Sequence, residues 1–159
     1  ETMTDAERRI FFEADEKRMI QRMIVVQYEK VQAASDFRFR YPSRPPQRFG
    51  SETYRFGTYV NDDQASATAA PDKEAALTRA FLRTHGLASP RTYRIARLAR
   101  VTDPKGLTEV IIFYMENADS DFAPGPLPGA DQDGDVPIEG AEQAALFGRL
   151  QQAIKVISG

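Results

Sequence analysis

The sequence predicts an α+β fold, in which an antiparallel sheet of about four strands packs against two or three helices. Three observations lead to this prediction. Segments of alternating apolar and polar residues are typical of half-buried strands. Between two such segments, Asp103-Pro104-Lys105-Gly106 has the residue types of a type I turn. Two later segments have the apolar spacing of amphipathic helices, which can cover a face of a sheet.

The composition is that of a globular protein and fits a single domain over residues 1–159. Apolar residues make up 42% and charged residues 28% of the chain. A chain of this length buries roughly 70% of the surface that its unfolded form exposes, so it needs no disulfide or metal to fold. The absence of cysteine excludes disulfides and cysteine nucleophiles. The longest apolar run, Val110 to Met115, is far shorter than the roughly 18 residues of a membrane span.

The sequence leaves the compartment open. The opening residues Glu1-Thr2-Met3 show no signal-peptide pattern. They are compatible with a mature form, an excised domain or a whole protein.

The first segment predicts a long helix. Thr4 and Glu7 have the spacing of a capping box, and helical spacing continues to about Ala34. A strand over residues 22–30 is an alternative, because this part is rich in β-branched residues. Apolar residues are spread around the helix, so we expect part of its surface to contact another chain, such as a second copy in a homo-oligomer. These residues are Ile10, Phe11, Phe12, Met19, Ile20, Met23, Ile24, Val25 and Val26.

The later elements follow from alternation, helical spacing and turn residues. Gly86 stands where a left-handed glycine ends a helix, and Leu87 can make the accompanying apolar contact. A long loop is expected over residues 117–134. The predicted strands are Phe37–Tyr41, Tyr54–Val60, Tyr93–Thr102 and Leu107–Glu116, and the predicted helices are Pro71–Thr84 and Glu139–Ile157.

Charge is unevenly distributed along the chain. Residues 37–59 contain five arginines and one acid, whereas residues 106–148 contain nine acids and no lysine or arginine. Arginines interleaved with aromatics can bind anionic groups and stack on bases. They are equally compatible with a solvated strand face, or with ion pairs between Arg38, Arg40, Arg94, Arg97 or Arg100 and the acidic half. The candidate partner-binding residues are Arg38, Arg40, Arg44, Arg48 and Arg55.

The sequence offers few candidates for catalysis. The single histidine, His85, falls in the last turn of a predicted helix, where a structural role is expected. Nucleophile-elbow, phosphate-loop and dinucleotide motifs are absent. The neighbouring carboxylates Asp62 and Asp63, and Asp119 and Asp121, are expected to be solvated loop residues.

One acidic segment, from Asp131 to Glu142, resembles an EF-hand calcium loop. Counted from Asp131, acids occupy the first, third, fifth, ninth and twelfth positions. The pattern is broken by Val136, which stands where the loop needs glycine, and by the lack of a preceding helix. The alternative is an acidic helix amino terminus, favoured by the helix dipole. The calcium hypothesis assigns the metal to Asp131, Asp133, Asp135, Glu139 and Glu142.

The function that the sequence indicates is a non-enzymatic protein-binding or assembly module, with another protein as the partner. Support comes from the missing catalytic motifs and from the arginine, aromatic and proline-rich segments. One alternative is a small enzyme or small-ligand carrier whose site is not visible in the sequence. The other is a binder of nucleic acid or another anionic polymer through the arginine face, which the sequence pI of about 5.5 disfavours. No cofactor is expected apart from the calcium of the preceding hypothesis.

Overall fold

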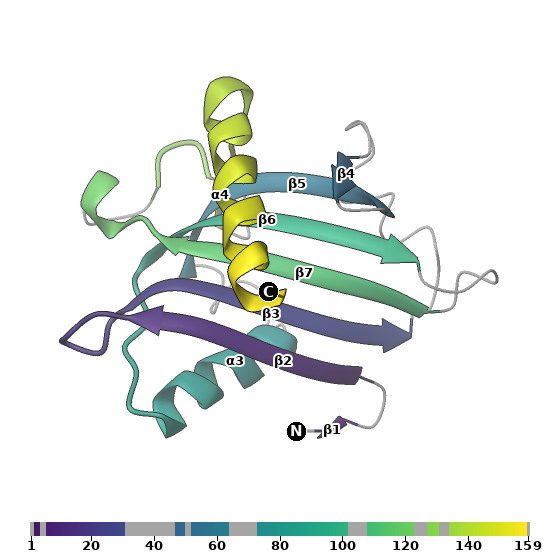
Figure 1. The fold of residues 1–159 in the computed structure, drawn as a ribbon. Helices are drawn as coiled ribbons and strands as arrows, with labels where there is room; N and C mark the ends of the chain where they lie inside the picture. The colour runs from purple at the N-terminus through teal and green to yellow at the C-terminus, as the bar shows by residue number, and fades with distance from the viewer. Residues whose placement is uncertain are drawn as a thin grey trace.

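The computed structural model describes residues 2–3, 6–30, 47–49, 52–63, 73–101, 108–122, 127–130 and 134–158 (Figure 1). Within these residues, eight strands form one sheet, and two α-helices and a short 3-10 helix accompany it. The α+β class is therefore confirmed. The predicted number of strands is too low.

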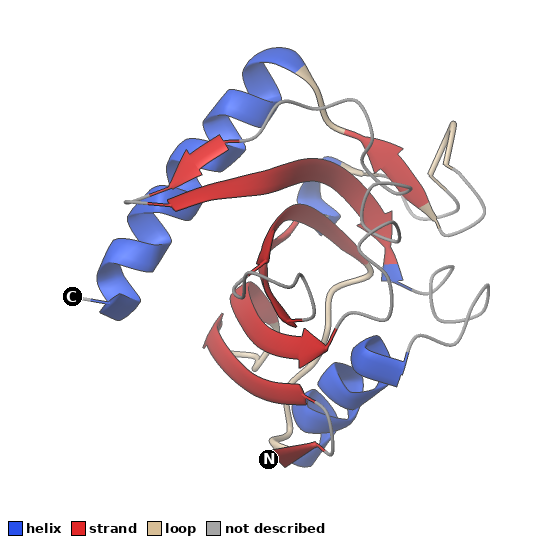
Figure 2. Cartoon of the chain, turned by 90° about the vertical axis from the view of Figure 1, so that its right-hand side faces the viewer, coloured by secondary structure: helices blue, strands red, loops and turns tan. Residues whose placement is uncertain are grey.

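The strands are β1 (Thr2–Met3), β2 (Ala6–Ala14), β3 (Ile20–Lys30), β4 (Gln47–Phe49), β5 (Glu52–Asp62), β6 (Thr92–Val101), β7 (Thr108–Asn117) and β8 (Asp135–Pro137). They lie in the order β1-β2-β3-β7-β6-β5-β4, and β8 also pairs with β5. All of these strand pairs are antiparallel. The sheet is strongly curved (Figure 2).

The predicted amino-terminal helix is wrong: this segment is the hairpin of β2 and β3. Phe11 lies opposite Ile24, and Arg9 opposite Val26. The alternative strand over residues 22–30 is the correct interpretation. The apolar residues were spread around the supposed helix because β3 is covered on both faces, which removes the usual alternation of a strand. Ile24 packs into one core, whereas Met23 and Val25 pack into another.

The two cores lie on opposite faces of the sheet, because successive side chains of a strand point to opposite sides. On one face, α4 (Gly140–Ser158) contributes the fully buried Leu146 and Leu150. On the other, α3 (Lys73–Thr84) contributes Leu82. Neither of these described helices combines the length and apolar character that crossing a membrane requires.

Most of the other predicted elements agree with the structure. The strands predicted at 54–60, 93–102 and 107–116 correspond to β5, β6 and β7, and the helices predicted at 71–84 and 139–157 correspond to α3 and α4. Gly86 has a φ of 67°, as a left-handed helix end requires. The Leu87 N–H donates to the Leu82 carbonyl at 2.9 Å. The strand predicted over residues 37–41 and the turn over residues 103–106 lie outside the described residues.

Arg18 fastens the turn between β2 and β3 to the end of α3. Its Nη2 donates to the His85 carbonyl at 2.6 Å, and its Nε donates to the Gly86 carbonyl at 3.1 Å. The Arg18 carbonyl accepts the Ala88 N–H at 2.8 Å. These bonds satisfy carbonyl groups at and just beyond the helix end and place a positive charge where the helix dipole favours it. Arg18 has a φ of 64°, so it holds this position in a strained backbone conformation.

We expect Arg18→Ala to lower the free energy of unfolding by about 1–2 kcal/mol, because two bonds from a charged donor are lost at an exposed site. Arg18→Gly loses the same bonds but relieves the left-handed strain, so its loss should be smaller. Urea unfolding followed by circular dichroism measures both. An Arg18→Ala variant as stable as the wild type, or a glycine variant less stable than the alanine variant, would contradict this account.

Candidate functional site

The predicted arginine site stays a prediction. Arg38, Arg40 and Arg44 lie outside the described residues, and of Arg48 only the backbone, in β4, is described. The Arg55 side chain is exposed on β5.

The acidic segment is only partly described. Asp131 and Asp133 lie outside the described residues, whereas Glu139 and Glu142 are exposed around the start of α4. The Asp135 Oδ1 accepts a hydrogen bond from the Asn61 side chain at 2.6 Å. Val136 is extended in β8, opposite Val60, and packs against the core on the α4 face. Across the described residues, no three carboxylate or imidazole groups gather as they would around a metal ion. The calcium hypothesis also stays a prediction.

His85 makes contacts within the end of α3, where the sequence predicts a structural role. Its Nδ1 lies 2.8 Å from the Phe81 carbonyl, and its ring lies against the Phe81 ring with 4.1 Å between centroids. These contacts lie at the last turn of α3, so His85 has a structural role at the end of this helix.

Three of the four neighbouring carboxylates are not solvated loop groups, contrary to expectation, whereas Asp121 is exposed. Asp62 is buried and lies 3.6 Å from Arg91, and Asp63 forms a 2.9 Å ion pair with Arg79. Asp119 accepts the backbone N–H of Thr92 at 2.7 Å. Each of these carboxylates therefore has a structural contact.

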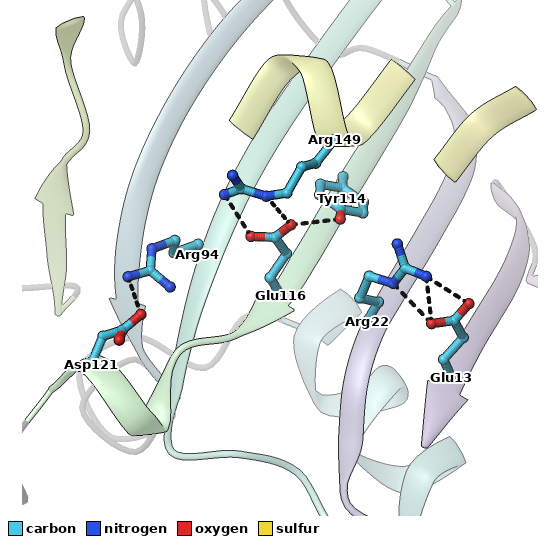
Figure 3. Close-up of polar contacts among 7 residues, drawn as sticks. All are labelled: Glu13, Arg22, Arg94, Tyr114, Glu116, Asp121 and Arg149. Carbon is cyan, nitrogen blue, oxygen red and sulfur yellow. Dashed lines mark hydrogen bonds and ion pairs between the residues drawn. The ribbon is translucent and has the colours of Figure 1, made fainter. Parts of the chain in front are cut away.

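Four charged residues of alternating sign form a row across neighbouring strands on the α4 face, shown in Figure 3. This charge row consists of Glu13 on β2, Arg22 on β3, Glu116 on β7 and Arg94 on β6, each opposite the next. Arg22 donates to both Glu13 oxygens, at 2.8 and 2.9 Å. Opposite charges facing each other across strands stabilise a sheet and fix its register.

The row also anchors α4 to the sheet. Arg149 of α4 donates to both oxygens of Glu116, at 2.7 and 2.9 Å, and the Tyr114 hydroxyl donates to Glu116 at 2.6 Å. Arg94 pairs with Asp121 at 2.6 Å, a pair between the arginines and the acidic half of the chain. The hydrogen bond to Glu116 raises the pKa of Arg149.

This network is balanced in charge, which argues for a structural role. Three carboxylates, of Glu13, Glu116 and Asp121, face three guanidinium groups, of Arg22, Arg94 and Arg149. Each of these carboxylates therefore has a guanidinium partner within the chain.

A second feature lies at the outer edge of β2, where the part of the chain that the structure describes supplies little pairing. On that side, β1 pairs only with Ala6 and Glu7. No other described strand pairs there, so residues Arg8–Ala14, here called the open edge, can accept a further strand. The pairing of β2 with β3 is irregular between Glu13 and Ala14, where β3 contains the extra residue Gln21.

Aromatic side chains are exposed at this edge. Phe11 is 39% and Phe12 is 41% exposed, and they point to opposite faces. Phe12 lies edge-on to Phe81 of α3, with 6.3 Å between ring centroids, so α3 supports it without covering it. Tyr28 on β3, on the face of Phe11, is 48% exposed. The sequence marked Phe11 and Phe12 for contact with another chain, but the predicted helix hid the fact that they lie on a strand edge.

Comparison with protein-family models, curated proteins and solved structures found no match to this chain. The function is therefore inferred from the geometry of the open edge and of the charge row.

Two buried tyrosines make the free energy of unfolding depend on pH in the alkaline range. Burial is the main cause that raises the pKa of Tyr93 and Tyr114, and the hydrogen bond to Glu116 raises that of Tyr114 further. The folded state thus holds these protons more tightly than the unfolded state, in which tyrosine titrates near pH 10. Their contribution is fully present below pH 10 and is lost as the pH rises above it.

We expect the free energy of unfolding to fall steeply above about pH 10 and to fall less steeply in Tyr93→Phe and Tyr114→Phe. Urea unfolding at several pH values, with tyrosinate absorbance recorded in parallel, measures this. Tyr28→Phe is the matched control, because Tyr28 is exposed. If Tyr28→Phe changes the pH dependence as much as Tyr114→Phe does, burial is not the cause.

Proposed function

We propose that this protein is a non-enzymatic protein-binding module that docks an extended segment of a polypeptide along the open edge of β2. The observation that carries the proposal is the outer side of β2 at Arg8–Ala14, along which none of the described strands pairs and whose centre exposes Phe11 and Phe12. Unpaired backbone groups of an edge strand can continue the ladder with an added strand, and side chains on alternate faces then select the partner.

The side chains of the edge define the chemistry of the partner segment. On the face of the charge row, Phe11 stands between Arg9 and Glu13; on the other face lie Ile10 and Phe12. A matching segment is extended and apolar at its centre. It places an acidic residue opposite Arg9 and a basic residue opposite Glu13.

Edge strands of stable proteins are usually protected against unwanted pairing by charges, bulges or short length. The open edge has charged residues only towards its ends, at Arg8, Arg9 and Glu13. Its centre carries two large aromatic side chains, and exposed aromatic groups of this kind are typical of interaction sites. This arrangement is more typical of an edge that binds a partner strand than of an edge that is protected against pairing.

The alternative functions find less support among the described residues. His85 is held in contacts that shape the end of α3, and the carboxylates of the charge row are held in ion pairs. Arg79 and Arg94 face carboxylates within the chain, which leaves less positive charge for an anionic polymer.

The proposal predicts that a designed peptide binds the open edge. The probe is a fluorescein-labelled peptide of alternating threonine and valine, with glutamate placed opposite Arg9 and lysine placed opposite Glu13. We expect saturable binding by fluorescence anisotropy, and we expect the double variant F11S/F12S to weaken it at least about tenfold, because aromatic anchors carry much of the binding energy of such interfaces.

The matched control is Tyr28→Ser, which removes an equally exposed aromatic ring away from the open edge. It should bind the peptide as the wild type does. A peptide with prolines at alternate positions, which cannot complete the ladder, should not bind. Absence of binding by the wild type, or equal binding by the wild type and F11S/F12S, would refute docking at this edge.

A further inference from the structure

We propose that the segment docked on the open edge is β2 of a second copy of this chain, paired antiparallel about a two-fold axis that passes through Phe11. This inference rests on the proposed function, since it uses the same edge. It follows from the length of the edge, from the order of its side chains and from the charge row.

The register is constrained before any side chain is considered. In a two-fold antiparallel pair, residues that face each other must point to the same side of the sheet, so the axis passes through a residue and not between two. The outer side of β2 is occupied by β1 up to Glu7, and the strand ends at Ala14. The midpoint of the remaining stretch, Arg8–Ala14, is Phe11.

In this register the side chains match. Arg9 of each copy faces Glu13 of the other on the face of the charge row, which gives two pairs of opposite charge. Ile10 of each copy faces Phe12 of the other on the opposite face, and the two Phe11 side chains meet at the axis. Such cross-strand pairs of opposite charge and of apolar groups are the ones that stabilise a sheet.

The neighbouring registers match poorly. An axis through Ile10 places Arg9 opposite Phe11. An axis through Phe12 places Phe11 opposite Glu13, and Arg9 opposite Asp15, which lies beyond the strand. Only the axis through Phe11 joins Arg9 to Glu13 and apolar side chains to apolar side chains.

The pairing also continues the charge row across the interface. Within one chain the row reads Arg94, Glu116, Arg22, Glu13 (Figure 3). In the proposed pair, Arg9 of the second copy takes the next position. Glu13 keeps its two bonds to Arg22, because a carboxylate has about four acceptor sites. On the other face, the row Met115, Met23, Phe12 continues into Ile10 of the second copy.

A cysteine scan can read the register directly, because the chain has no cysteine of its own. Two cysteines can form a disulfide only when their Cα atoms lie within roughly 4.4–6.8 Å. The proposed axis brings the two copies of residue 11 face to face, whereas the two copies of residue 10, and of residue 12, are offset along the strands. Under mild oxidation, we expect Phe11→Cys to form a covalent dimer and Ile10→Cys and Phe12→Cys to remain largely uncross-linked.

Light scattering of the untagged wild type at high micromolar concentration should give twice the 17.8 kDa chain mass. Arg9→Glu and Glu13→Lys should each weaken the dimer at least about tenfold, because each creates two like-charge pairs. An equimolar mixture of the two variants should recover the dimer. In the mixed pair, the glutamate introduced at position 9 of one copy faces the lysine introduced at position 13 of the other in reversed polarity, and Glu13 faces Arg9 as in the wild type. Thermal unfolding of each variant tests whether it is folded. Recovery of the dimer in the mixture is a second test, because only folded variants can pair.

Three outcomes would overturn the inference: a monomeric wild type, preferential cross-linking at residue 10 or 12, or dimers indifferent to both charge reversals. A monomeric wild type that still binds the designed peptide would refute the second copy and leave edge docking intact. A monomeric wild type that binds no peptide would refute both.

Discussion

The pairing of β3 with β7 joins two halves of the sheet that are far apart in sequence. Arg22 lies opposite Glu116, and Val25 lies opposite Phe113, over nine consecutive residue pairs. This register aligns the charge row, places Glu116 under Arg149 of α4, and leaves β2 on the outside of the sheet. Since a shift of one residue would exchange the two faces of β3, both cores depend on the same register.

Burial on both faces does not by itself hide a strand from the sequence, since β7 is covered on both faces, as β3 is, and was still predicted next to its turn residues. The hairpin of β6 and β7, the helices α3 and α4, and the left-handed Gly86 follow from local patterns, so their sequence signals suffice. The segment of β2 and β3 carries apolar residues on both sides, and periodicity cannot distinguish such a strand from a helix. The β-branched residues Ile24, Val25 and Val26 were the signal that favoured the strand.

The candidate site could be predicted only in part, for a related reason. Phe11 and Phe12 were two of the nine apolar residues from which contact with another chain was predicted, and apolar character is a local property. Whether a strand lies at the edge of a sheet depends on the order of all the strands, and this order cannot be read from one segment of the sequence. In the same way, the uneven charge distribution anticipated a pair such as Arg94 with Asp121, whereas the bond between Glu116 and Arg149 needed the position of α4.

The opposite margin of the sheet has a consequence for how far assembly can proceed. There β5 is flanked by β4 at residues 52–54 and by β8 at residues 59–61, and the Ile138 N–H donates to the Thr58 carbonyl at 3.0 Å. Growth of a sheet into a fibre, one subunit after another, requires two free strand edges on each subunit. The proposed pairing would occupy the outer edge of β2, the only long free edge among the described strands. If two copies pair through β2 as proposed, the short strands β4 and β8 would leave no second long edge among the described strands, so the assembly would stop at a closed pair.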